Sequence, residues 1–150
     1  MKDLDWSNLS FGYRQTDYNV RCYYRDGKWG EIEVCSDEYL KLHMAATCLH
    51  YGQEAFEGLK AYRCPDGKVR VFRMDENAAR LQSTCRGILM PEVPTEMFEE
   101  MVKKVVRLNQ EWIPTYESGA TLYIRPLLIG TSAQVGVHPA KEYCFLIFVT

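Results

Sequence analysis

The sequence predicts a two-layer α+β domain in which an antiparallel or mixed sheet carries two helices packed on one face. Three observations favour this fold class. Strand-like runs joined by turn dipeptides fill the first half of the chain, two amphipathic helical segments follow, and strand-like runs return at the end. The 150 residues contain no repeat, low-complexity tract or linker, so we expect a single domain spanning 1–150.

Two hairpins are expected ahead of the helices. In the stretch NVRCYYRDGKWGEIEV, two strand-like runs meet at Asp26 and Gly27, a dipeptide that suits a type I′ turn. In EGLKAYRCPDGKVRVFR, two further runs are separated by a Cys-Pro-Asp-Gly turn at 64–67. Strand alternation places four residues in and before this second hairpin on one face: Phe56, Gly58, Lys60 and Tyr62.

Helical periodicity then predicts two helices. The first is expected to run from Asp75, as its N-cap, to about Leu89, and the second from Thr95, as its cap, to about Trp112. The apolar stripe of the first contains Ala78, Leu81, Cys85, Ile88 and Leu89, and that of the second contains Phe98, Met101, Val102, Val105 and Trp112. At about 100° per residue, Arg80 points away from the first stripe.

The last third of the chain returns to strands. The runs ATLYIRPLLIG and YCFLIFV flank a loop, TSAQVGVHPAKE, whose glycine and small polar residues suit either a binding loop or an ordinary surface connection. In the first run, alternation places Tyr123 and Arg125 on the face opposite to the branched apolar residues. Because Pro126 cannot donate a ladder hydrogen bond, we expect this strand to lie at an edge of the sheet or to be interrupted there.

Composition excludes several function classes. A net charge of −2 gives no reason to expect nucleic acid or an anionic membrane as a partner, and no apolar run approaches the roughly 20 residues that span a bilayer. The N-terminus does not resemble a signal peptide, so the six cysteines are expected to be free thiols in a cytoplasmic protein. His43, Cys48 and His50 come nearest to a metal site, but nothing supplies a fourth ligand, and we expect no metal.

Three cationic residues are candidates for chemistry. Arg125, in an apolar strand, must either pair with an internal carboxylate or bind a carboxylate or phosphate ligand. Arg80 is either a solvated side chain or a second anion-binding group. Lys60 would act as a Schiff-base nucleophile only with a depressed pKa, and a nearby Glu57 would instead favour the charged form, so we do not expect this role. No glycine-rich phosphate loop or Ser-His-Asp set points to an independent active site.

Three motifs, in order along the chain, carry a specific resemblance. LHYGQEAFEGLKAYR at 49–63, ARL at 79–81 and LYIRPLLIGTSAQVGV at 122–137 together resemble the N-terminal part of branched-chain amino-acid aminotransferases, fold-type IV enzymes that use pyridoxal 5′-phosphate. The resemblance is collinear from about Phe11 to Thr150. It implies the small domain of these enzymes, and because the chain stops inside an apolar run, we expect a fragment of a longer protein.

The resemblance assigns roles to matching positions. Arg80 would bind the cofactor phosphate. Tyr123 and Arg125 would border the substrate side-chain pocket, where Arg125 would pair with the distal carboxylate of glutamate, and Gly58 would lie where the backbone nears the substrate. Apolar walls for leucine, isoleucine and valine side chains would come from Phe11, Tyr51, Phe56 and Val137.

The same resemblance implies that part of the active site is missing from these 150 residues. The Schiff-base lysine would lie in a second domain after Thr150, so no catalytic residue is expected in this chain, which alone should not transaminate leucine with 2-oxoglutarate. Tyr51 and the loop that carries Val137 would serve the active site of the neighbouring subunit, which implies a homodimer.

Two alternatives stay open at this point. One is a non-catalytic module that dimerises or binds a small carboxylate. The other keeps the fold but changes the substrate, to that of a D-amino-acid transaminase or an aminodeoxychorismate-lyase-like enzyme of fold type IV. The YIRP segment and the complete EAFEGLKAYR motif favour the branched-chain enzyme.

Overall fold

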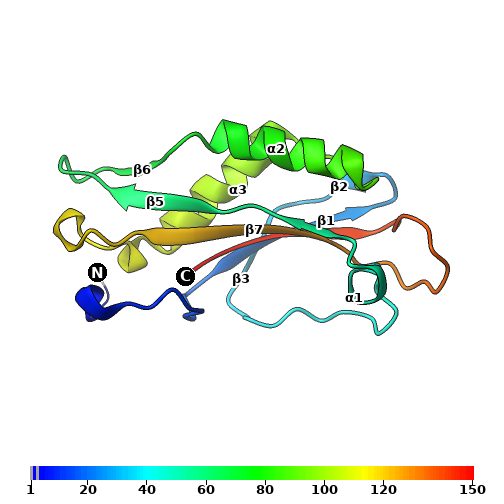
Figure 1. Cartoon of the computed structure of the whole chain (residues 1–150), viewed down its shortest axis with the longest axis horizontal. Helices are drawn as coiled ribbons and strands as arrows, with labels where there is room; N and C mark the ends of the chain where they lie inside the picture. The colour runs from blue at the N-terminus through cyan, green and yellow to red at the C-terminus, as the bar shows by residue number, and fades with distance from the viewer. Residues whose placement is uncertain (1, 3) are drawn as a thin grey trace.

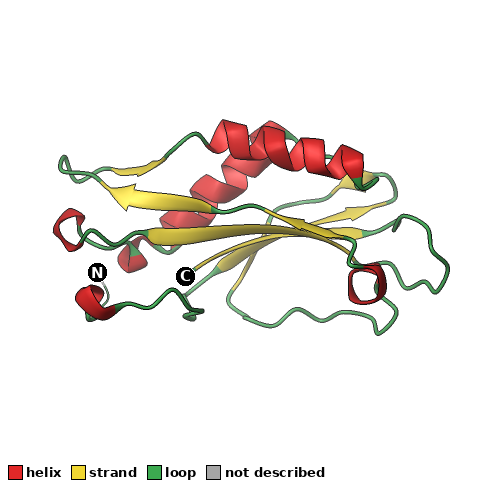
Figure 2. Ribbon diagram, viewed as in Figure 1, coloured by secondary structure: helices red, strands yellow, loops and turns green. Residues whose placement is uncertain are grey.

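The computed structural model describes residue 2 and residues 4–150 of the chain. They form one sheet with two long helices on one of its faces, which confirms the predicted two-layer α+β fold (Figure 1; Figure 2). Along the sheet the strands follow the order β2-β1-β8-β7-β5-β6, with β3 paired to β1 and β4 paired to β7. Every strand pair in this described part is antiparallel.

The strands are β1 (Asn19–Arg25), β2 (Lys28–Trp29), β3 (Glu33–Cys35), β4 (Glu54–Phe56), β5 (Leu59–Arg63), β6 (Val69–Val71), β7 (Leu122–Gly130) and β8 (Tyr143–Val149). The helices are α1 (Thr47–Tyr51), α2 (Met74–Gly87) and α3 (Thr95–Leu108), and single 3₁₀ turns occur at η1 (Trp6–Asn8), η2 (Gln110–Trp112) and η3 (Tyr116–Ser118). The short helix α1 is not predicted by the sequence, because five residues are too few to show a helical period. None of the helices in the described ranges combines the length and hydropathy that a membrane span requires.

Both predicted hairpins are present, and their turns have the expected backbone. Asp26 and Gly27 have φ values of 52° and 77°, the positive values that a type I′ turn requires at both central positions. β5 and β6 pair across the turn at 64–67, where Gly67 has a φ of 76°. The second run of the first hairpin differs from the prediction, because it divides around Gly30 into two short strands that both pair with β1.

Strand β7 is central, so the prediction that it lies at an edge is wrong. It pairs with β8 on one side and with β4 and β5 on the other. The alternative, an interruption of this strand at Pro126, is wrong as well, because β7 runs unbroken from Leu122 to Gly130. The break lies in the facing strand instead, between β4 and β5, where the Glu57 amide donates to the Pro126 carbonyl at 2.9 Å. In an antiparallel strand the N–H and the carbonyl of one residue point toward the same neighbouring strand. The Pro126 carbonyl faces Glu57, so the N–H that proline lacks would also have pointed to the segment between β4 and β5.

Helix α2 is confirmed, with other ends than predicted. It starts one residue before Asp75, which lies in the first turn, and its N-cap is Arg73 with a φ of 47°. It ends at Gly87, because Leu89 has a φ of 57°, outside the right-handed helical region. Ile88 and Leu89 are 40% and 69% exposed, so their place in the buried stripe is wrong. The stripe is confirmed for Ala78, Leu81 and Cys85.

Helix α3 is also confirmed, and both of its predicted ends change. Pro94, rather than the threonine after it, is the N-cap. The helix ends at Leu108, and Trp112 lies in η2, half-buried. Asn109 is the C-cap of the helix, and its buried side chain bonds to the backbone of the N-terminal segment at 17–18. The buried face of the helix consists of Phe98, Met101, Val102, Val105 and Val106.

The core fills the space between the two long helices and the sheet. Its fully buried members include Leu81, Phe98, Met101, Val102, Ile124, Phe145 and Ile147. The segment after β3 crosses the opposite face of the sheet, where Leu40 and Leu42 pack over the β7–β8 pair (Figure 1). Tyr123 and Arg125 lie on this second face as well, but they are only half-buried. The residues that the sequence marks for ligand binding therefore lie outside the main core.

Candidate functional site

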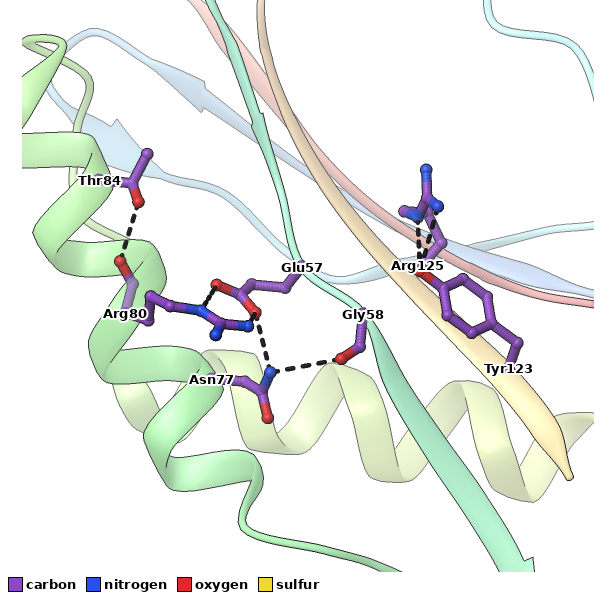
Figure 3. Close-up of polar contacts among 7 residues, drawn as sticks. All are labelled: Glu57, Gly58, Asn77, Arg80, Thr84, Tyr123 and Arg125. Atoms are coloured by element: carbon purple, nitrogen blue, oxygen red, sulfur yellow. Dashed lines mark hydrogen bonds and ion pairs between the residues drawn. The ribbon is translucent and has the colours of Figure 1, made fainter.

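Strand β7 presents Tyr123 and Arg125 on the face of the sheet away from the helices, because the residues that alternate with them are buried in the core. The Arg125 guanidinium donates from Nε and Nη2 to the Tyr123 hydroxyl, at 3.2 and 3.1 Å (Figure 3). Its central carbon lies 4.6 Å from the centroid of the Phe56 ring and 5.3 Å from that of Tyr123. Arg125 is thus held by two aromatic rings, those of Phe56 and Tyr123, and by the hydroxyl of Tyr123.

Phe11 and Gly58 complete the surroundings of Tyr123. The Phe11 ring meets the Tyr123 ring edge-on, with centroids 5.2 Å apart. The Gly58 backbone comes so close that an added Cβ would stand 2.6 Å from the Tyr123 hydroxyl. We call Phe11, Phe56, Tyr123 and Arg125 the aromatic–arginine cluster. Because Phe11 and Phe56 are 83% and 62% exposed, the cluster offers apolar surface beside a cation.

The charge of Arg125 has no counterion among the residues that the structure describes. No carboxylate among residues 2 and 4–150 lies within ion-pair distance of its guanidinium, so the structure shows no internal salt bridge between Arg125 and these residues. Cation–π contacts stabilise a guanidinium without neutralising it, which leaves its remaining N–H groups free to bind an anion. A pocket of about 430 Å³ opens beside the cluster, and its lining includes Phe11, Arg14, Lys60, Tyr123 and Thr150.

Arg80, in contrast, has a counterion. Its Nε donates to Oε1 of Glu57 at 2.8 Å, and its Nη2 donates to Oε2 at 2.6 Å (Figure 3). These hydrogen bonds and, to a lesser extent, the charge of Glu57 raise the pKa of the Arg80 guanidinium. The Arg80 side chain is 70% exposed, whereas that of Glu57 is only 3% exposed. One edge of the Arg80 guanidinium is therefore fixed by a buried carboxylate, and the other edge faces solvent.

The predicted site residues fall into three places. One group is the aromatic–arginine cluster together with Gly58 beside it. Arg80 lies on α2, and the segment that joins β4 to β5 lies between Arg80 and this group (Figure 3). Tyr51 and Val137 lie elsewhere, where both line a pocket of about 400 Å³ and the Tyr51 hydroxyl donates to the Val135 carbonyl.

Lys60 lies on the exposed face of β5, as strand alternation predicts. The exposed positions of this stretch are Phe56, Gly58, Lys60 and Tyr62. Glu57 belongs to the opposite, buried set, and its carboxylate pairs with Arg80. Glu57 is therefore not the ion-pair partner of Lys60.

The described residues contain no cluster of three side chains that could hold a metal ion. Three residues, His43, Cys48 and His50, come nearest to a metal site in the sequence. In both histidines a ring nitrogen contacts a backbone group instead. His43 Nδ1 accepts from the Ala45 amide at 3.1 Å, and His50 Nε2 lies 2.8 Å from the Met44 carbonyl oxygen. All six cysteines are free thiols.

Glu57 is the residue that sequence reasoning did not single out for the site. In the stretch AFEGLKA, the other residues of its register are Ala55, Leu59 and Ala61, and all three are buried. An acidic residue at a buried position needs a cation or several hydrogen-bond donors. Its position among these apolar residues is therefore a signal that the sequence contains, although the sequence does not reveal which cation it meets.

Comparison with known proteins finds relatives of the chain as a whole. No family model matches the chain. The chain is similar to the branched-chain-amino-acid aminotransferase of Haemophilus influenzae, with 52% identity over 148 residues that cover 99% of this chain and 43% of the relative. It is similar to that of Helicobacter pylori with 46% identity, over 99% of this chain and 44% of the relative. The chain thus spans less than half the length of these relatives.

Solved structures agree with the curated relatives. The branched-chain aminotransferase from Escherichia coli superposes with a TM-score of 0.63 at 25% identity, over 90% of this chain and 41% of that one. A second branched-chain aminotransferase, from T.th. and complexed with N-(5′-phosphopyridoxyl)-L-glutamate, gives a TM-score of 0.60 at 26% identity, over 85% and 40%. The chain therefore belongs to the branched-chain-amino-acid aminotransferase family, as a segment that corresponds to less than half the length of its relatives.

Proposed function

We propose that the chain supplies the substrate-binding part of a pyridoxal 5′-phosphate-dependent transaminase. The complete enzyme would move the amino group between branched-chain L-amino acids (leucine, isoleucine and valine) and 2-oxoglutarate. The aromatic–arginine cluster carries this proposal, because it joins exposed aromatic faces to a guanidinium without a counterion among the described residues. The names of the similar curated proteins support the same activity.

A transaminase of this kind must accept an aliphatic side chain and a carboxylate side chain in one pocket. Phe11 and Phe56 would receive the aliphatic one, since burial contributes about 0.8 kcal/mol per CH₂ group. Arg125 would pair with the distal carboxylate of glutamate or 2-oxoglutarate. Tyr123 accepts two hydrogen bonds from Arg125, and so fixes the orientation of the guanidinium. Gly58 provides the close approach that this orientation needs.

The residues present fit a phosphorylated cofactor. The exposed edge of Arg80 carries Nη1, for which no protein partner occurs among the described residues, and a guanidinium edge suits a phosphate. Arg80 would hold the cofactor phosphate, and the phosphopyridoxyl compound in the T.th. relative supports this role. Pyridoxal 5′-phosphate would supply the electron sink that amino-group exchange requires.

We propose that the lysine which binds the cofactor lies outside these 150 residues, in a second domain. Lys60 lies on an exposed strand position, and the similar relatives are more than twice as long as this chain, which supports that proposal. Tyr51 and Val137 share a pocket away from the cluster, consistent with a role in the site of a second copy and hence with a homodimer. Six free thiols favour a cytoplasmic location.

The proposal can be tested with a hybrid in which these 150 residues replace the matching segment of the Haemophilus influenzae relative. We expect the hybrid to form glutamate from L-leucine, 2-oxoglutarate and pyridoxal 5′-phosphate, and the isolated chain to form none above a blank. A folded but inactive hybrid, or one that prefers D-alanine to L-leucine, would contradict the proposal. Turnover by the isolated chain would contradict the proposed location of the cofactor lysine.

The role of Arg125 has its own test in this hybrid. Because a hydrogen bond to a charged group contributes about 1.5–3 kcal/mol, Arg125→Gln should lower kcat/KM for 2-oxoglutarate by roughly 10- to 100-fold. The value for L-leucine should change far less, since the aromatic walls remain. Arg107→Gln, at an exposed position on α3, is the matched control and should leave both values unchanged. Equal losses for both substrates in Arg125→Gln would contradict the assignment of the distal carboxylate.

A further inference from the structure

Glu57 connects the two arginine sites, because its backbone bonds to β7 and its side chain bonds to Arg80. It occupies the interruption between β4 and β5, where its amide donates to the Pro126 carbonyl at 2.9 Å. Phe56, before it, belongs to the aromatic–arginine cluster, and Gly58, after it, lies against Tyr123 of that cluster. The side chain of Glu57 points the other way, toward α2, and the residue is 4% exposed (Figure 3). The backbone of Glu57 thus belongs to the substrate side, and its carboxylate belongs to the Arg80 side.

Three N–H donors from α2 hold the Glu57 carboxylate. Arg80 contributes two, through Nε to Oε1 and Nη2 to Oε2, and Asn77 contributes one, from Nδ2 to Oε2 at 2.8 Å. Asn77 also approaches the Gly58 carbonyl at 3.4 Å. Asn77 and Arg80 are three residues apart on α2, so both reach the carboxylate from one face of the helix. A buried carboxylate with three donors has little freedom to move, and neither has the guanidinium edge bound to it.

We infer that Glu57 is a positioning residue for the cofactor: it fixes the inner edge of the Arg80 guanidinium so that the outer edge meets the cofactor phosphate. The inference rests on the proposed function, because it requires that Arg80 binds this phosphate. An exposed arginine otherwise has many rotamers, and a ligand must restrict them when it binds. The bidentate pair with Glu57 restricts them in advance.

The pairing also separates the tasks of the two arginines. Glu57 compensates the charge of Arg80, so Arg80 offers directed N–H donors rather than an excess positive charge. Arg125 keeps an uncompensated charge, as far as the described residues show, and so remains the stronger attractor for a substrate carboxylate. A dicarboxylate substrate would therefore be drawn to the cluster, whereas Arg80 would recognise a phosphate through geometry.

The test compares the affinities of the apo hybrid for pyridoxal 5′-phosphate and for pyridoxal, which lacks the phosphate. The dissociation constant for pyridoxal divided by that for pyridoxal 5′-phosphate measures recognition of the phosphate alone, and a lower ratio means weaker recognition. Arg80→Ala should lower this ratio by about 10- to 100-fold, as expected for the loss of charge-assisted hydrogen bonds. Glu57→Gln should lower it by about 10-fold, a loss typical of removing a group that orients a ligand-binding side chain. Glu57→Gln should have no further effect in an Arg80→Ala background.

Asp66→Asn is the matched control, because it removes a bidentate carboxylate–arginine pair, that of Asp66 with Arg70, from the exposed second hairpin. It should leave the ratio unchanged. If Glu57→Gln does not fold, Glu57→Asp keeps the charge but cannot reach both nitrogens, and it should also lower the ratio. In the isolated chain, Glu57→Gln should shift the Arg80 Nε–Hε resonance.

The outcomes separate the inference from the proposed function. If Arg80→Ala lowers the ratio but both Glu57 variants keep it within about twofold of the parent, the inference is wrong and the role of Arg80 stands. If Glu57→Gln lowers the ratio equally with and without Arg80, Glu57 acts independently and the inference is again wrong. If Arg80→Ala itself changes nothing, the phosphate role of Arg80 fails, and the inference fails with it.

Discussion

A Cβ atom on Gly58 would lie 2.6 Å from the hydroxyl oxygen of Tyr123 and 3.3 Å from Cζ of its ring. Only a glycine lets the phenol occupy this position, in which its hydroxyl accepts both hydrogen bonds from Arg125. The Gly58 backbone therefore comes close to Tyr123, the residue that orients the Arg125 guanidinium. The requirement for glycine here is steric rather than conformational.

Gly58→Ala should weaken recognition of the substrate carboxylate without unfolding the domain. The methyl group must displace the end of the Tyr123 side chain, which breaks its hydrogen bonds with Arg125. In the hybrid enzyme we expect kcat/KM for 2-oxoglutarate to fall by about 10-fold, the equivalent of one hydrogen bond to a charged group. The value for L-leucine should fall less.

Gly87→Ala is the control for this substitution. Gly87 ends α2, and a Cβ there would meet no heavy atom within 4 Å. The change should raise the free energy of unfolding by about 0.4–1 kcal/mol, because alanine lowers the entropy of the unfolded chain, and it should leave both activities unaltered. If Gly58→Ala behaves like Gly87→Ala, the steric argument is wrong.

The two faces of the sheet could be predicted from sequence because strand alternation depends only on a period of two residues. This period placed Tyr123 and Arg125 together, and it holds from Ala55 to Ala61 even across the interruption between β4 and β5. The neighbours of a strand depend on long-range pairing instead. Pro126 therefore gave the wrong position for β7 and the wrong strand for the break. The strand of the proline is unbroken, and it is the partner strand that stops opposite Pro126.

The limits of the helices and the pairing of the arginines were less accessible. Leu89 carries an ordinary helical sequence signal, yet its positive φ ends the buried stripe of α2, and nothing local in the sequence requires that value. Spacing shows that Arg80 points away from that stripe, but it cannot show that Glu57, on a distant strand segment, reaches it. Both features are set by tertiary contacts that become definite only when the elements pack.

Asn109→Ala should be among the most destabilising single changes in this chain. The fully buried Asn109 side chain accepts from the amides of Asp17 and Tyr18 at 3.0 and 3.1 Å, and it donates to the carbonyls of Tyr18 and Val105 at 2.9 and 2.8 Å. Alanine would leave several buried backbone groups unsatisfied. We expect the free energy of unfolding to fall by about 2–4 kcal/mol in urea titrations.

Gln110→Ala is the neighbouring control, because this side chain is exposed, and its effect should stay within about 0.5 kcal/mol. A loss below about 1 kcal/mol for Asn109→Ala would mean that water replaces the amide.

Asp66 should titrate at an unusually low pH. Its carboxylate accepts from both terminal nitrogens of Arg70, at 2.8 and 2.7 Å, and from the Lys68 amide at 3.1 Å. The bond with Arg70, followed by the backbone bond, lowers the pKa of Asp66 from 3.8 to about 2. Because the folded pKa is the lower one, the contribution of this pair to stability is complete above about pH 4 and is lost as the pH falls through about 2.

The carboxyl carbon resonance of Asp66 provides the measurement, with an expected midpoint near 2 in the parent chain. Arg70→Gln should move that midpoint toward 3.8, since the group with the largest effect is then absent. The control is Arg107→Gln, at an exposed position on α3, which should leave the Asp66 midpoint unchanged. An Asp66 midpoint that stays near 2 in the variant would show that the backbone bond, rather than the arginine, lowers the pKa.

The six thiols should differ widely in reactivity in the folded chain. Burial raises the pKa of Cys85 and of Cys144 to about 11, and both are fully buried, whereas Cys35 and Cys64 are half-buried. Because the thiolate is the nucleophile, a pulse of iodoacetamide at about pH 8 should label Cys35 and Cys64 first. Cys85 and Cys144 should gain label only in urea, as peptide mass spectrometry can show. If Cys144 were alkylated as fast as Cys35 without denaturant, the β7–β8 pair would have to open readily, which contradicts its position at the centre of the sheet.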